Sequence, residues 1–271
     1  TKTGERAYQL ARTVRAKQGD KLIFFDAGKR RVIDTAYIEA VEHIGGGYPV
    51  VTLDRDIDGI ICTEGKSTQG TFVWNANACN RGSVIKNSTF KNSSRWVLIS
   101  AANTLFEGNT VEDCVGIAFK DESLGRTWAA VPPSSSTIRN NSIIGTRLAE
   151  TYAPVELMLQ EAQLGSSAGL DGLLFEGNII DQPNAIGSID IMGVKNLYMM
   201  NNVIKNNVST EKTMIPVYIY NSEVELLDGL KIEYAAPIEA GVTIIGSKID
   251  EANIKNIEIV APEGAEPYII Y

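Results

Sequence analysis

The chain has 271 residues, of which 44% are hydrophobic and 21% charged, so it carries enough apolar material for a sizeable core. Its formal net charge is −8 and no run of Lys or Arg offsets it, which counts against a nucleic-acid partner. The same charge favours a neutral glycan over a polyanionic one as ligand. No apolar stretch approaches the ~20 residues that a membrane span requires.

Cysteine usage and the first residues bound the chain further. Cys62, Cys79 and Cys114 are odd in number and lack a CxxC spacing, which counts against a zinc site and a disulfide framework. We expect them to be small buried apolar side chains, and we expect no metal and no cofactor. Residues 1–20 are polar and begin without Met, so no signal peptide is predicted. A mature form or a piece of a longer protein is expected.

Residues 1–68 are predicted to form a small antiparallel β-barrel-like module. Three segments alternate between apolar and polar residues as half-buried strands do: Gly19–Phe25, Tyr37–Val41 and Tyr48–Leu53. Glycines between these segments supply the turns. Residues 1–18 fit either a short helix or a lead-in strand, and the sequence does not distinguish the two.

From Val84 onward the sequence repeats itself. Each copy has the order apolar, apolar, polar, Asn or Gly, Asn or Ser, small or β-branched, apolar. The copies are Val84–Phe90, Leu105–Val111, Thr137–Ile143, Leu174–Ile180 and Tyr198–Ile204, followed by the weaker Leu226–Ile232 and Asn253–Ile259. They start 21, 32, 37, 24, 28 and 27 residues apart. The shortest interval is close to one coil of a solenoid, so the excess is expected to lie in loops.

This repeat predicts an all-β fold in which residues 69–271 form a right-handed, single-stranded parallel β-helix of about seven coils. The short β-branched runs are strands, and Asn or Gly in the following bend tolerates left-handed backbone angles. Stacked coils place four asparagines at equivalent positions, where their amides can hydrogen-bond along the stack: Asn109, Asn141, Asn178 and Asn202. A leucine-rich repeat needs a leucine framework and a β-sandwich needs hairpins, and neither fits.

The stretch from Asn80 to Ile143 resembles a known enzyme family. The matching segments are Ser94–Ser100, Phe106–Val111, Asp121–Glu122 through to Trp128, and Ile138–Ile143, with Gly19–Phe24 matching a strand of the barrel ahead of the coils. On these residues, and over about residues 15–205, the chain is similar to the C-terminal barrel and β-helix of glycoside hydrolase family 110. These are bacterial exo-acting α-1,3-galactosidases of the pectin-lyase-like β-helix superfamily.

The resemblance implies a carbohydrate-active protein of the bacterial periplasm or exterior, either an α-galactosidase-like glycoside hydrolase or a fragment of one. In that family the catalytic aspartates lie in a paired-Asp segment ahead of the barrel, and this chain has no match to that segment. The catalytic coils are therefore expected to precede Thr1, or the chemistry has been moved or lost. The expected partner is carbohydrate, and the oligomeric state is not predicted.

The densest set of polar side chains is Phe119–Trp128, which follows a predicted strand and opens the loop of the 32-residue interval. Long loops on a rigid scaffold tend to carry function. Glycoside hydrolysis needs two carboxyl groups at one sugar, and Asp121 and Glu122 are the candidate catalytic pair. The candidate substrate-binding residues are Lys120, Arg126 and Trp128, with Arg95 and Trp96 one coil earlier. A solvated loop with ordinary surface charges is the alternative.

A second loop, residues 145–169, contains the predicted strand Pro154–Glu161. Glu156 in this strand is expected to face the same groove as Asp121 and is a further candidate substrate-binding residue. Asp190, Tyr218 and Tyr220 continue that surface on later strands with less support from the sequence. Exposed charge without function is again the alternative.

Two other motifs give little evidence for a metal site or a catalytic site. Asp54, Asp56 and Asp58 imitate the opening of a calcium loop, but position twelve is Gly65 instead of Glu. His43 is the only histidine, which counts against a histidine metal site or a Ser-His-Asp triad. Three function hypotheses remain: a carbohydrate-active hydrolase, a non-catalytic binding or structural β-helix module, and a polysaccharide lyase with a basic catalyst and calcium.

Overall fold

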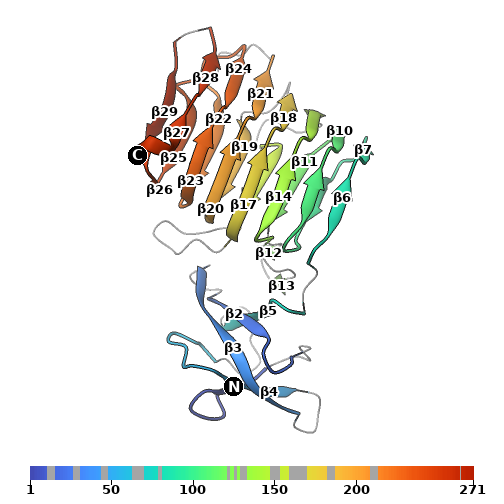
Figure 1. The fold of residues 1–271 in the computed structure, drawn as a ribbon, viewed down its shortest axis with the longest axis vertical. Helices are drawn as coiled ribbons and strands as arrows, with labels where there is room; N and C mark the ends of the chain where they lie inside the picture. The colour runs from blue at the N-terminus through green and yellow to red at the C-terminus, as the bar shows by residue number, and fades with distance from the viewer. Residues whose placement is uncertain are drawn as a thin grey trace. The chain divides into compact units, whose positions relative to one another are not determined.

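The computed structural model describes residues 1–10, 16–26, 31–43, 48–62, 70–78, 81–120, 123–124, 127–128, 133–146, 153–158, 170–181, 187–207, 213–262 and 264–271. The chain divides into two compact units, Thr1–Asn80 with Glu122–Val131, and Arg81–Asp121 with Pro132–Tyr271. Both are all-β, as predicted, and the described residues add one short 3-10 helix, η1 (Glu251–Asn253) (Figure 1). No helix in these ranges is long and apolar enough to cross a membrane.

The first unit contains one antiparallel sheet, curled into a half-barrel, which confirms the predicted antiparallel module. Its strands are β1 (Ala7–Gln9), β2 (Lys21–Asp26), β3 (Arg31–His43), β4 (Pro49–Leu53) and β5 (Thr71–Asn75), in the order β1-β4-β3-β2-β5. Its core includes Leu22, Phe24, Ile38 and Leu53, each at most 2% exposed. Among the first residues, the strand alternative holds for Ala7–Gln9, which pair with β4.

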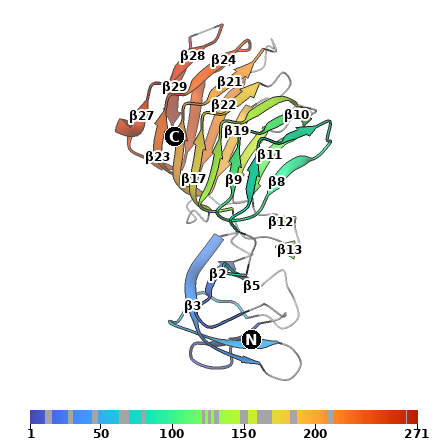
Figure 2. The same cartoon turned by 45° about the vertical axis from the view of Figure 1, so that its right-hand side comes forward.

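The second unit consists of three parallel sheets that the chain visits in turn, which confirms the predicted parallel β-helix (Figures 1 and 2). The first sheet contains β6 (Val84–Lys86), β9 (Leu105–Glu107), β14 (Ser136–Arg139), β17 (Leu170–Glu176), β20 (Val194–Met200), β23 (Glu223–Asp228) and β26 (Lys248–Ile249), and β27 (Ile254–Lys255) also pairs with β23. The second contains β7 (Thr89–Lys91), β10 (Thr110–Cys114), β15 (Ser142–Thr146), β18 (Ile179–Asp181), β21 (Val203–Asn206), β24 (Lys231–Tyr234) and β28 (Glu258–Val260).

The third sheet contains β8 (Trp96–Ile99), β11 (Gly116–Lys120), β16 (Val155–Met158), β19 (Gly187–Met192), β22 (Ile215–Tyr220), β25 (Ala240–Ile245) and β29 (Glu266–Ile270). A separate two-stranded antiparallel pair, β12 (Ser123–Leu124) and β13 (Thr127–Trp128), follows β11 in the chain. Because one coil supplies one strand to each sheet, residues far apart in the sequence become neighbours on adjacent strands.

The core of the β-helix is a set of stacked apolar rows. In the first sheet the inward row is the second apolar position of each repeat. Its five inner members are fully buried, Phe106, Ile138, Phe175, Met199 and Leu227, and Ile85 and Ile254 at the two ends are partly buried. Successive side chains of a strand point to opposite faces, so the residues between inward ones point to solvent. The same register that stacks the core therefore arranges the outward side chains in rows.

Left-handed residues form the bend after each strand of the first sheet, and they alternate between Asn and Gly from one coil to the next. They are Asn87, Gly108, Asn140, Gly177, Asn201, Gly229 and Asn256, with φ between +50° and +66°. A Cβ added to Gly108, Gly177 or Gly229 would lie 2.5 or 2.6 Å from Oδ1 of the asparagine one coil earlier. Each asparagine side chain thus occupies space that the next glycine leaves open, which accounts for the alternation.

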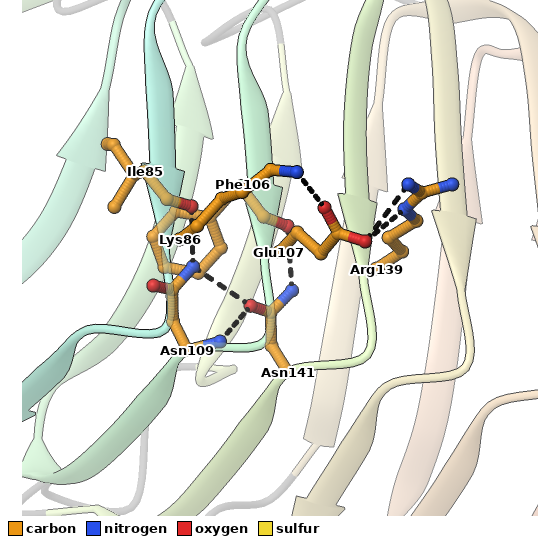
Figure 3. Close-up of polar contacts among 7 residues, drawn as sticks. All are labelled: Ile85, Lys86, Phe106, Glu107, Asn109, Arg139 and Asn141. Atoms are coloured by element: carbon orange, nitrogen blue, oxygen red, sulfur yellow. Dashed lines mark hydrogen bonds and ion pairs between the residues drawn. The ribbon is translucent and has the colours of Figure 1, made fainter.

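At four of these seven bends the residue after the left-handed position is an asparagine, and these four form the predicted asparagine ladder. The Oδ1 atoms of Asn141, Asn178 and Asn202 each accept from the backbone N–H of the ladder asparagine one coil earlier, at 2.9 to 3.1 Å. Each Nδ2 donates to a backbone carbonyl of that earlier coil, such as Asn109 to Ile85 and Asn141 to Phe106, both at 3.0 Å (Figure 3). All four side chains are at most 1% exposed. The ladder therefore fixes the register between coils with buried, satisfied polar groups.

Asn178→Ala should lower the free energy of unfolding by about 3 kcal/mol or more, because several buried donors and acceptors lose their partners together. Asn178 accepts from both the backbone and the side chain of Asn141 and donates to Ile138 and Asn202. Urea denaturation measures the change. Ser88→Ala, in the partly buried first coil of the same series, is the control and should cost less than about 1 kcal/mol. Equal losses in the two variants would contradict the ladder's role.

Gly177→Ala should cost about 2–3 kcal/mol, since its left-handed backbone disfavours a side chain and the new methyl would meet Asn140. Gly82 has φ of +72° and no atom within 4 Å of an added Cβ, so Gly82→Ala reports the backbone cost alone. In an Asn140→Gly background the cost of Gly177→Ala should fall to that of Gly82→Ala. Denaturant titration of all four variants tests this, and an unchanged cost in the Asn140→Gly background would contradict it.

Candidate functional site

The structure describes some of the predicted site residues and not others. Asp121, Glu122 and Arg126 lie outside the described residues, and their assigned roles stay predictions. Trp128 lies in β13, and its backbone pairs with Ser123. Arg95 is exposed immediately before β8. The other three candidates, Trp96, Lys120 and Glu156, all belong to the third sheet.

These three side chains lie on the outer face of the third sheet. Ile117 and Phe119 of β11 and Val155 and Leu157 of β16 point into the core. By alternation Ala118, Lys120 and Glu156 point outward. The register pairs Ala118 with Glu156 on the neighbouring strand, so Lys120 lies one position further along the same face.

Lys120 joins the other two candidates. Its Nζ lies 2.5 Å from Oε2 of Glu156 and 5.3 Å from the centre of the Trp96 ring. The Lys120 and Glu156 side chains are only 17% and 8% exposed, so their attraction is screened less than that of a surface pair. The ammonium is therefore held between a carboxylate and the face of an indole ring. The Ser100 hydroxyl donates to the Lys120 carbonyl at 2.7 Å and fixes the end of β11.

Asp190 extends this group by one strand. It faces outward between the buried Ile189 and Ile191 of β19, and the register places it beside Glu156. Burial, followed by the negative charge of Glu156, raises the pKa of Asp190 from 3.8 to about 6. Two neighbouring carboxyl groups thus differ in environment, since Glu156 has an ammonium partner and Asp190 lies beside a like charge.

Two tyrosines continue the row on β22. Tyr218 is in register with Asp190, and Tyr220, two residues on, is in register with Met192. The two rings stack at 6.2 Å with an interplanar angle of 11°. Burial, together with the neighbouring Tyr220 and Asp190, raises the pKa of Tyr218. The result is a pair of stacked aromatic rings on the strand next to Asp190.

The outer face is sheltered around β11 and β16. Ala118 is fully buried although it points outward, and Glu156, counted with its backbone, is only 6% exposed. Shelter from water strengthens the electrostatic interactions of Lys120, Glu156 and Asp190. We refer to Trp96, Lys120, Glu156, Asp190, Tyr218 and Tyr220 together as the outer-face cluster.

Asp190 and the two tyrosines had less support from the sequence as site candidates than Asp121 and Glu122. The reason is that Asp190 and the two tyrosines become neighbours only through the register between strands. Asp190 and the two tyrosines each lie on a strand whose inward-facing residues are ordinary apolar core residues, such as Ile189 and Ile191 on either side of Asp190. An outward carboxyl or ring between two β-branched core residues is the available signal, and matching these positions coil by coil could have ranked them higher.

The rejected motifs have local roles. Asp54 Oδ1 accepts from the backbone N–H of Tyr37, and Asp56 lies 3.7 Å from Lys2. His43 ends β3. Within the described residues, no three His, Cys, Asp or Glu side chains are grouped so that they could hold a metal ion.

Comparison with known proteins gives a distant structural likeness and no family. No protein-family model matches the chain, and no curated protein matches it. The three-sheet architecture is distantly similar to the Gp54 tailspike of Acinetobacter baumannii bacteriophage AP22, solved in complex with A. baumannii capsular saccharide. The TM-score is 0.21 and the identity 11%, over 92% of this chain. The chain spans 52% of the tailspike chain, about half its length.

The raised pKa of Asp190 makes stability depend on pH in a defined direction. The folded protein holds this proton more tightly than the unfolded chain, so the stabilising contribution is full below pH 3.8 and is lost as pH rises to about 6. Asp190→Asn should therefore raise the free energy of unfolding at pH 7.5 by about 1–3 kcal/mol, with little gain near pH 4. Urea denaturation at several pH values measures this. Asp181→Asn, on the outer face of the second sheet, is the control, and an equal gain there would contradict the assignment.

Proposed function

We propose that the outer-face cluster binds a neutral carbohydrate and that the chain is a glycoside hydrolase or a fragment of one. The observation that carries the proposal is the in-register placement of Glu156, Asp190 and Tyr218 on three consecutive strands. It puts two carboxyl groups of different character next to an aromatic surface on a sheltered face. The proposal extends to a location in the bacterial periplasm or exterior.

Sugar binding follows from the aromatic groups. Tyr218 and Tyr220 supply half-buried aromatic rings with hydroxyl tips, which suit a sugar ring that is apolar on one face and polar at its edge. Trp96 offers a second aromatic side chain on the same outer face, beyond Lys120. Neighbouring strands are about 4.8 Å apart, and β22 is the fourth strand along from β8, so the two are about 19 Å apart and the face can accommodate more than one sugar unit.

Acid catalysis follows from the two carboxyl groups. Asp190 with a pKa of about 6 keeps its proton in mildly acidic solution and can donate it to a glycosidic oxygen. Glu156, paired with Lys120, supplies a negative charge one strand away that stabilises positive charge on the sugar ring. Asp121 and Glu122 remain further candidate carboxyl groups, because they follow Lys120 directly in the chain.

A second candidate function is glycan binding without turnover. The Glu156 carboxylate already has a partner at 2.5 Å and is nearly buried, which limits its access to a sugar. A polysaccharide lyase is less favoured, since it requires a free basic side chain and Lys120 is held between Glu156 and Trp96.

The proposal is tested with the 271-residue chain on a glycan array and on aryl-α-galactosides, the latter because of the family resemblance. Asp190→Asn should reduce turnover by about 10²- to 10⁴-fold while leaving glycan affinity within a few-fold. Activity of the unchanged protein should fall as pH rises through about 6, where Asp190 loses its proton.

Tyr218→Ala is expected to weaken binding of the same glycan by at least about tenfold, because the stacking surface is lost. Asp181→Asn on the second sheet is the matched control and should change neither property. Binding without turnover would select the second function, and the absence of both would refute the proposal.

A further inference from the structure

The outer face of the first sheet carries two rows of side chains that no part of the proposed function uses. One, called the apolar row, is apolar except for Thr137 and contains one residue from each of six consecutive strands: Val84, Leu105, Thr137, Leu174, Tyr198 and Leu226. Val84 is 65% and Tyr198 42% exposed, and the other members are half-buried. Six strands at ~4.8 Å spacing make a continuous strip about 24 Å long. Apolar side chains gathered in this way on a surface mark an interaction site.

The second row runs beside the first, two residues further along each strand. It consists of Lys86, Glu107, Arg139, Glu176, Met200 and Asp228, so its charges read plus, minus, plus, minus, neutral, minus. Lys86 and Arg139 hold Glu107 between them at 2.7 and 2.9 Å (Figure 3). These contacts lower the pKa of Glu107 and order the charged side chains along the face.

We propose that this face is an interface between two copies of the chain, related by a two-fold axis that runs along the strands between β14 and β17. Such an axis lays each row of one copy over the same row of the other copy, with the order of the coils reversed. In the apolar row it pairs Val84 with Leu226, Leu105 with Tyr198, and Thr137 with Leu174. All six members of the strip then meet a partner.

The charged row selects the same axis. When the charged row of one copy faces the reversed charged row of the other, Lys86 meets Asp228, Arg139 meets Glu176, and Glu107 meets the neutral Met200. No like charges meet. Moving the axis onto β14 brings Arg139 against itself and Glu107 against Glu176. Moving it onto β17 brings Glu176 against itself and Glu107 against Asp228. A two-fold axis along the coils, placed between the two rows, keeps the coil order and lays the charged row over the apolar one, which buries charge without partners.

A second copy is the occupant that this pattern fits. The order of charges is complementary to its own reversal, and a two-fold interface requires that self-complementarity. Because this face is separate from the third sheet, the dimer leaves the outer-face cluster out of the interface.

Sedimentation velocity over a wide range of protein concentration tests the proposal. The full chain should form a dimer that dissociates on dilution, and Leu174→Glu should raise its dissociation constant at least about tenfold, because each copy then buries a carboxylate against Thr137. Ile179→Glu is the matched control, since Ile179 is 43% exposed on the outer face of the second sheet. Circular dichroism checks that both variants fold.

Cross-linking tests the two-fold geometry itself. Val84→Cys combined with Leu226→Cys places the two thiols five strands apart in one copy, about 24 Å, but opposite each other across the dimer. Mild oxidation should give a covalent dimer in higher yield than the parent chain with its own cysteines. A monomer at every concentration, a dimer that Leu174→Glu leaves intact, or a cross-linking yield no higher than the parent's would overturn the proposal.

Discussion

The structure of the second unit depends on the residue-by-residue register between consecutive coils. The asparagine ladder sets that register from inside, because each amide bonds both to the next asparagine and to a backbone carbonyl one coil away. The apolar rows require the same alignment, since Phe106, Ile138 and Phe175 stack only when the strands are in step. A slip of one residue would turn every core side chain outward, so the two constraints support each other.

Register determines what each outer face presents, and the faces differ. On the third sheet it gathers Glu156, Asp190 and Tyr218 in one row, where shelter and like charge raise the pKa of Asp190. On the first sheet it produces an apolar row beside a row of alternating charge. Both arrangements combine residues from neighbouring coils that are 21 to 37 positions apart in the sequence. A rigid scaffold with separate faces can thus hold a ligand site and an assembly surface at once.

Much of the fold could be predicted from the sequence because its determinants are local and repeated. Seven copies of one short pattern identified the strands, the bends and the positions of Asn109, Asn141, Asn178 and Asn202. The alternation of Asn and Gly at the bends was not predicted, because it arises from packing between coils. The sequence singled out Lys120, Glu156 and Trp96, and Lys120 contacts the other two, but their role in binding stays a prediction. The place of Asp190 beside Glu156 comes from strand register, which the sequence does not show. The connecting loops are long and differ in length, so the sequence alone does not show which residues of neighbouring strands lie side by side.

The most direct test of the account is the titration of the Asp190 carboxyl by carbon-detected NMR, in the unchanged protein and in Glu156→Gln. The account predicts a pKa near 6 that falls in the variant, because the neighbouring negative charge is gone, yet stays above 3.8 because burial remains. An Asp190 carboxyl that titrates near 3.8 in both proteins would show that the two side chains are not neighbours on one sheltered face.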